Sequence, residues 1–158
     1  MPAQRPLFAL ALLAAFAPVA AHAAQAWSGF PKKLGELAST PVTHAVIDGQ
    51  PSLVLAAGGQ LHCHRLDARP CPGFPLALGE KTLAVGAPAV GDLDGDGRPE
   101  IALGVTGGRL LVFTSDGTPL PFAPAADSEA GPSILDVDGD GRRELVFGTR
   151  QGLLHAYA

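Results

Sequence analysis

Two nearly identical acidic segments constrain this chain more than any other feature of its sequence. The first runs from Asp92 to Glu100, and the second, from Asp136 to Glu144, begins 44 residues later. Each has three aspartates on alternate positions, then a glycine, and closes on a glutamate. Carboxylates about 4 Å apart repel each other by roughly 4 kcal/mol per pair at an effective dielectric near 20, so a cation must compensate them. Calcium fits best, because it takes about six to eight oxygen ligands in irregular geometry.

The position of the closing glutamate distinguishes these loops from a helix-loop-helix calcium site. Such a site needs a bidentate acid at the twelfth position, which is Leu103 in the first loop. Leu103 lies in the apolar run 101–105, which is typical of a strand. A solvated acidic turn is the alternative, but the duplicated spacing favours two calcium sites set between strands. The expected ligands, with the arginines contributing their carbonyl oxygens, are Asp92, Asp94, Asp96, Arg98 and Glu100 in one loop and Asp136, Asp138, Asp140, Arg142 and Glu144 in the other.

The first residues have the features of a secretory signal peptide. Arg5 precedes an apolar run over 7–21, and small residues then allow cleavage after residue 23 or as late as residue 26. The run is shorter than the roughly 20 residues that a membrane-spanning helix needs. We therefore expect a signal peptide over 1–23 and a mature protein in the periplasm or outside the cell, without a membrane span.

Composition narrows the remaining function classes. Acidic residues outnumber basic ones by 15 to 11, and no basic cluster is present, so a nucleic acid is not an expected partner. Glycine and proline contribute 20 and 15 residues, and the apolar runs between them are short. This pattern favours short strands joined by tight turns.

Self-comparison predicts the architecture. Gly29-Phe30-Pro31 returns as Gly73-Phe74-Pro75, again 44 residues later, and three strand-like segments align at 59–64, 108–113 and 152–157. Periods of this size with several short strands are typical of β-propeller blades. We therefore predict an all-β fold with a repeat region over 27–158. Its three units of four-stranded antiparallel sheet are expected at about 42–78, 86–124 and 132–158.

The three predicted units are not equivalent. The loop of the first unit is shortened to 48–52 and keeps one carboxylate, so no metal is expected there. The third unit lacks a fourth strand, which the strand over 27–34 can supply within one chain or from a neighbour. Pairing between chains would join two copies head to tail into a six-bladed ring. A homodimer of this kind is expected in preference to a lone three-bladed ring.

These residues resemble the FG-GAP or VCBS repeat of integrin alpha chains and of many exported bacterial proteins. The shared motifs are Asp-x-Asp-x-Asp-Gly-x-x-Glu between strands, the Leu-Gly or Phe-Gly that follows it, and the Gly-Phe-Pro strand between blades. The resemblance implies a calcium-stabilised β-propeller, with the ten loop residues named above as ligands. Family propellers usually have more blades than the three expected here.

The cysteines and their neighbouring histidines offer a second candidate site. Cys63 and Cys71 are the only cysteines, and in an exported chain a disulfide is expected between them. A thiolate metal site with His62 or His64 is the alternative, but Cys63 points away from both histidines because side chains alternate along a strand. Trp27 is either a sugar-stacking residue or, more commonly at a strand start, a core residue.

Two classes of function remain. No serine has a nucleophile-elbow context, and the clustered acids are expected to bind metal, so we expect no enzymatic activity. The favoured function is an exported calcium-binding module that binds a protein or glycan in an adhesion-type role. The alternative is a propeller-based exported lyase or hydrolase, or the accessory domain of one. That alternative requires an acid, base or arginine cluster outside the two loops.

Overall fold

The computed structural model describes residues 28–121, 127–128 and 130–158, so the predicted signal peptide and Trp27 lie outside the described residues. Every regular element in the described part is a β-strand. No helix among those residues is long and apolar enough to cross a membrane. The predicted all-β class is confirmed.

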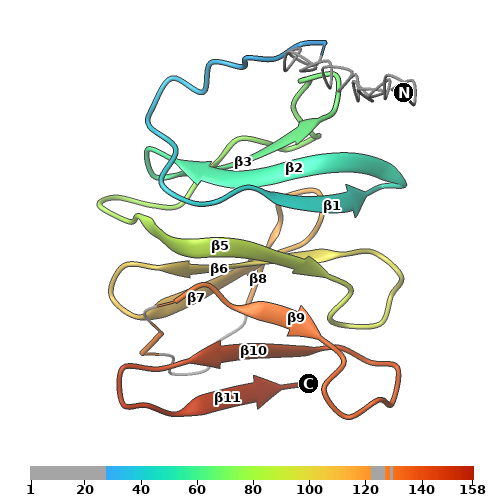
Figure 1. Cartoon of the computed structure of the whole chain (residues 1–158), viewed down its shortest axis with the longest axis vertical. Coiled ribbons are helices and arrows are strands. Elements are labelled where there is room, and N and C mark those ends of the chain that lie inside the picture. The colour runs from blue at the N-terminus through green and yellow to red at the C-terminus, as the bar shows by residue number, and fades with distance from the viewer. Residues whose placement is uncertain (1–27, 122–126, 129) are drawn as a thin grey trace, which may run out of the picture.

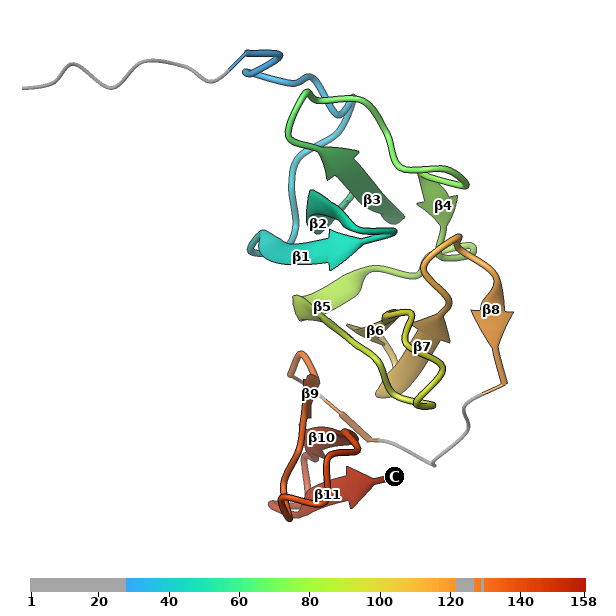
Figure 2. The ribbon, with the colours of Figure 1, turned by 90° about the vertical axis from the view of Figure 1, so that its right-hand side faces the viewer.

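The described strands form three antiparallel sheets, in chain order. The first sheet contains β1 (Thr43–Ile47), β2 (Gln50–Ala57), β3 (Gln60–Arg65) and β4 (Leu76–Ala77). The second contains β5 (Ala84–Gly91), β6 (Glu100–Val105), β7 (Arg109–Phe113) and β8 (Pro119–Leu120). The third contains β9 (Ser133–Leu135), β10 (Glu144–Gly148) and β11 (Leu154–Tyr157). The sheets lie in an open row, with the first and third at opposite ends (Figures 1 and 2).

Each sheet is a meander, because strands that follow one another in the chain are neighbours in the sheet, and several of them are joined by tight turns. Gly58 and Gly59 join β2 to β3 with φ angles of 55° and 77°. A two-residue hairpin turn with positive φ at both positions matches the twist of the strands it joins. Glycine adopts this conformation without the steric penalty of a Cβ atom.

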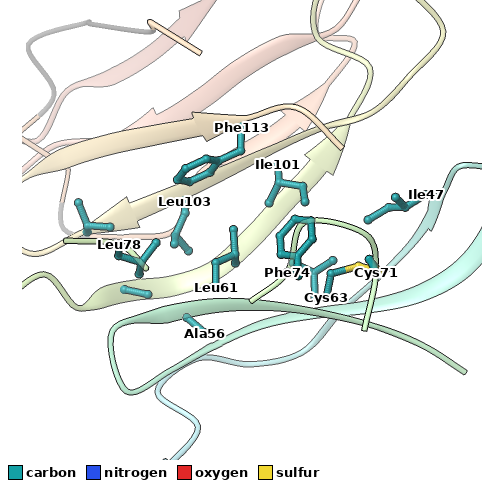
Figure 3. Close-up of a cluster of buried hydrophobic side chains, with 13 residues drawn as sticks. Ile47, Ala56, Leu61, Cys63, Cys71, Phe74, Leu78, Ile101, Leu103 and Phe113 are labelled. Atoms are coloured by element: carbon teal, nitrogen blue, oxygen red, sulfur yellow. A yellow bond between two sulfur atoms is a disulfide. The ribbon is translucent and has the colours of Figure 1, made fainter. Parts of the chain in front are cut away.

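Two apolar cores hold the row together, one on each face of the second sheet. The core between the first and second sheets includes Leu61, Phe74 and Leu103 (Figure 3). The core between the second and third sheets includes Ala102 and Leu145. All six residues of β6 are buried, because successive side chains face opposite cores. Each leucine or isoleucine buried in this way contributes about 1.5–3 kcal/mol.

Cys63 and Cys71 form the predicted disulfide, with their Cα atoms 5.3 Å apart. Both residues are buried in the core that contains Phe74. The bond bridges the connection between β3 and β4, which is longer than the corresponding connection between β7 and β8. Because both sulfur atoms are bonded to each other, the thiolate metal site is not formed.

Residues 28–38 lie against the first sheet, at the end of the row far from β11 (Figures 1 and 2). Phe30 and Leu34 line a small apolar pocket with Leu53 and Leu55 of β2. The structure therefore does not support the prediction that this segment completes the third sheet within one chain. The physical reason is that the back face of the first sheet is apolar, and this segment covers it locally.

His62 and His64 lie on β3, on the face opposite Leu61 and Cys63. The two side chains are 5 % and 7 % exposed. His62 Nε2 and both ring nitrogens of His64 have no hydrogen-bond partner among the described residues. Burial is the main cause that lowers the pKa of both imidazoles. The charge of His64 lowers the pKa of His62 further. The charge of Lys32 does the same for His64, where the backbone of Ala68 and Arg69 partly opposes the shift.

These histidines should make stability depend on pH. Their pKa values are lowered in the folded state, so the unfolded chain takes up protons first, and the free energy of unfolding should fall as the pH drops below about 6.5. His64→Phe, which introduces the residue found at the aligned Phe113, should flatten this fall. The melting temperature between about pH 7.5 and pH 5, at fixed calcium concentration, measures the effect. His44→Gln, at an exposed position of β1, is the control, and an unchanged pH profile for His64→Phe would contradict the assignment.

Candidate metal centres

The first acidic loop connects β5 to β6, and its own backbone holds its carboxylates in place. Asp92 accepts hydrogen bonds from the N–H groups of Gly95 at 2.8 Å and Gly97 at 3.0 Å. Asp94 accepts from the N–H of Asp96 at 3.0 Å, and Asp96 accepts from the N–H of Arg98 at 2.7 Å. As a result, Asp92, Asp94 and Asp96 bring carboxylate oxygens within 4.8 Å of one another.

Glu100, at the start of β6, closes the loop from its buried side. It is 2 % exposed, and its Oε2 accepts a hydrogen bond from the N–H of Leu93 at 2.8 Å. Burial raises the pKa of this carboxyl; the bond from Leu93 opposes the shift, and the charges of Asp94 and Asp96 add to it. A buried carboxylate beside two others is stable in its ionised form when a cation lies among them.

The second acidic loop, between β9 and β10, repeats this arrangement bond for bond. Asp136 accepts from Gly139 N–H at 2.6 Å and Gly141 N–H at 3.0 Å. Glu144, 9 % exposed, accepts from Val137 N–H at 2.8 Å. The two remaining aspartate contacts are also reproduced, from Asp140 N–H to Asp138 and from Arg142 N–H to Asp140.

The structure brings most, but not all, of the predicted ligands together. In the second loop the gathered carboxylates are those of Asp136, Asp138 and Glu144, whereas Glu100 and Asp140 lie outside the gathered sets. Arg98 and Arg142 orient the aspartates through their N–H groups, and their predicted role as carbonyl ligands stays a prediction. Gly97 and Gly141, with φ angles of 85° and 90°, make the sharp turn at the sixth position.

The donor set fits a hard cation. Every gathered side chain offers oxygen, and none offers nitrogen or sulfur. Oxygen ligands in an irregular loop suit calcium better than magnesium, which demands near-octahedral geometry and gives up its water reluctantly. A bound cation would supply charge compensation and a link between the strands, so its chemistry here is structural.

The shortened loop of the first sheet is bound by the guanidinium group of Arg65, the last residue of β3. Arg65 Nη1 donates to the carbonyl oxygen of Ile47 and to Ser52 Oγ, the latter at 2.9 Å. Arg65 Nη2 lies 3.3 Å from Asp48 Oδ2. Ser52 occupies the position that Glu100 holds in the second sheet, directly before the apolar part of the strand. A fixed cation from the protein therefore lies in the loop for which no metal was predicted.

Sequence reasoning missed Arg65. The signal that could have found it is an arginine at the end of the third strand in the one unit whose loop keeps a single carboxylate. Its pairing with Asp48 depends on the β1–β2 and β2–β3 hairpins, which bring the two ends together. Asp48 also lies 3.5 Å from Arg98, so it links the shortened loop of the first sheet to the first acidic loop.

The acidic loops border one cleft. Both lie along the same edge of the row (Figure 1), and the cleft between them has a volume of about 610 Å³. Asp92 and Asp94 line one side, and Arg142 and Arg143 line the other. The cleft thus has an acidic wall and a basic wall.

Residues 92–147 match the family model of the FG-GAP-like repeat. The chain contains an FG-GAP-like repeat. The matched segment begins at the first ligand aspartate and ends within β10, so it includes both acidic loops. The predicted family resemblance is thus confirmed over the part of the chain that carries the candidate metal centres. No curated protein matches the chain.

Arg65→Met should destabilise the first sheet, because it leaves the Asp48 carboxylate and the Ile47 carbonyl without their shared cation. Hydrogen bonds to a charged group contribute about 1.5–3 kcal/mol, so we expect a loss of about 1–3 kcal/mol in the free energy of unfolding. Chemical denaturation measures it. Arg69→Met is the matched control, since that side chain is 84 % exposed and its ion pair with Asp67 is at the surface. Equal stability of the two variants would show that the Arg65 contacts contribute nothing.

Proposed function

We propose that this chain is an exported, calcium-binding module of the β-propeller type that binds a protein or glycan and has no catalytic role. The observation that carries the proposal is the duplicated loop, in which the same backbone hydrogen bonds orient the same carboxylates twice. The shared sequence gives both turns the same shape, and in each loop that shape gathers three carboxylates.

Calcium is proposed because each loop concentrates the negative charge of several carboxylates in a small space. Each set contains three carboxylates within 4.8 Å of one another. The corresponding loop of the first sheet, 48–52, is instead bound by the guanidinium group of Arg65. The FG-GAP-like repeat supports the same ion, as the sequence resemblance implies.

A propeller-type arrangement is supported by how the sheets pack. Each described sheet is an antiparallel meander, and successive sheets pack face to face through apolar cores. The second sheet is covered on both faces, as an interior blade is. We propose that the three sheets are blades in this sense.

Export is proposed from the sequence features of residues 1–23 together with the disulfide. A bond between Cys63 and Cys71 is favoured in an oxidising compartment. Calcium is also plentiful outside the cytoplasm, which suits sites whose role is structural.

The cleft between the two loops is the proposed binding surface. Its basic wall, Arg142 and Arg143, suits carboxylate or sulfate groups, because guanidinium groups bind such anions through paired hydrogen bonds. Calcium in the first loop would give the opposite wall an affinity for hydroxyl or carboxylate oxygens. Acidic glycans and acidic protein surfaces have this chemistry.

Calcium should raise the melting temperature, and chelation should lower it. An ion at a hundredfold its dissociation constant adds roughly 2.7 kcal/mol per site, because it binds only the folded state. Asp94→Ala and Asp138→Ala should each remove about half of the calcium-dependent gain. Differential scanning calorimetry in calcium, magnesium and chelator measures it.

Asp67→Ala is the matched control for the calcium experiment, since Asp67 is exposed and lies outside both loops. It should keep the full calcium response. Identical melting curves of the unmodified protein in calcium and in chelator would refute calcium binding.

Ligand binding should depend on calcium and on the basic wall of the cleft. On an array of acidic and neutral glycans, and in capture from the exported fraction, Arg143→Ala should reduce binding by about tenfold, the effect of losing one charge-assisted contact. Arg69→Ala, at a strongly exposed position away from the cleft, should bind as the parent does. Equal binding by both variants would exclude the cleft as the binding surface.

A further inference from the structure

We propose that the apolar pocket between residues 30–34 and the first sheet binds a small monocarboxylate, whose apolar part fills the pocket and whose carboxylate lies between His64 and Lys32. The pocket is on the face of the first sheet opposite the core that contains Leu61. None of its lining residues belongs to the cleft between the acidic loops. The inference therefore goes beyond the proposed function and requires neither calcium nor a glycan.

The walls of the pocket define the apolar part of the ligand. The pocket has a volume of about 130 Å³, and an apolar cavity of about 150 Å³ holds a molecule the size of benzene. Its apolar lining residues are Phe30, Leu34, Val42, Leu53 and Leu55. One aromatic ring or one short branched chain matches this space.

His64 provides the first polar group of the pocket. Its side chain is 7 % exposed, and neither ring nitrogen has a hydrogen-bond partner among the described residues. Buried polar groups without a partner are rare in native proteins, and a bound molecule is one explanation for them. The aligned residue of the second sheet is Phe113, which packs in a core. Packing alone therefore does not require an imidazole at this position.

Lys32 provides a positive charge at the same pocket. It lines the pocket together with His64, and its side chain is exposed. In the described part of the chain it forms no ion pair. An ammonium group and an imidazole at the polar end of an apolar pocket suit a carboxylate, which accepts hydrogen bonds from both. The charge of Lys32 also disfavours a metal ion at His64.

The backbone on the other side of His64 prepares the ring for an anion. Burial is the largest cause that lowers the pKa of His64, and Lys32 adds to it, so the ring is neutral near pH 7. The backbone of Ala68 and Arg69 acts in the opposite direction, as carbonyl acceptors do. An imidazolium has two donors, one for a bound carboxylate and one for this backbone. Binding should therefore take up a proton, and the affinity should rise as the pH falls from about 8 to about 6.5.

The other elements packed around His64 supply no carboxylate that would compete with the ligand. On its own strand, His62 has a pKa lowered by burial and then by His64, so it is also neutral. In the β3–β4 connection, the Asp67 carboxylate is paired with Arg69 at the surface. In the N-terminal segment, Glu36 lies over the β2–β3 turn. The residues that β2 contributes to the pocket are apolar.

Isothermal titration calorimetry of the full chain, purified after any processing, tests the pocket with benzoate and 3-methylbutanoate as probes. Dissociation constants of about 0.1–1 mM are expected for ligands of this size. Benzamide has the same ring without the charge, and it should bind about tenfold more weakly, the effect of losing one charge-assisted contact. Equal binding of benzamide and benzoate, or no benzoate binding up to about 10 mM, overturns the proposal.

Two variants locate the binding. His64→Phe and Lys32→Met should each weaken benzoate binding about tenfold, and His64→Phe should also abolish its pH dependence. Lys33→Met is the matched control, since this neighbouring lysine does not line the pocket, and it should keep the parent affinity. Lys32→Met alters an exposed side chain, so its result stands even where His64→Phe does not fold. Parent affinity in Lys32→Met, or an unchanged pH dependence in His64→Phe, overturns the proposal and leaves the metal centres and the cleft untouched.

Discussion

Face-to-face packing of the sheets is the interaction on which the rest of this structure depends. Each sheet is too small to fold alone, since a few short strands bury little surface until a second layer covers them. The second sheet buries surface on both of its faces, with Leu103 packed toward the first sheet and Ala102 toward the third. The acidic loops, the disulfide and the N-terminal segment are all positioned by this row.

The acidic loops show how a local sequence can prepare a cation site before any cation binds. Backbone N–H groups neutralise part of the aspartate charge, and glycine at the sixth position turns the chain so that those groups point inward. Glu100 and Glu144 then fix each loop to the buried start of a strand. The remaining repulsion among the carboxylates would favour the uptake of a hard cation, as proposed above.

The loop of the first sheet shows a second solution to the same electrostatic problem. Where the acids are lost, Arg65 contributes a permanent charge that bonds to Ile47 and Ser52 and lies beside Asp48. A guanidinium group cannot be removed by chelation or dilution, so this end of the row has a stability independent of metal. The chain thus combines two candidate cation sites with one site of fixed charge.

The sequence by itself determined the all-β class, the disulfide and the local form of both acidic loops, because these depend on residues close together in the chain or on short repeated patterns. It also indicated every gathered carboxylate, together with two further acids, Glu100 and Asp140, that lie outside the gathered sets. Only the tertiary structure decided that Arg65 reaches Asp48, since that contact requires two hairpins to bring distant residues together. The tertiary structure also decided that residues 28–34 lie against the first sheet and not beside β11. Strand pairing between distant segments depends on which apolar face is nearest, and a linear pattern does not contain that distance.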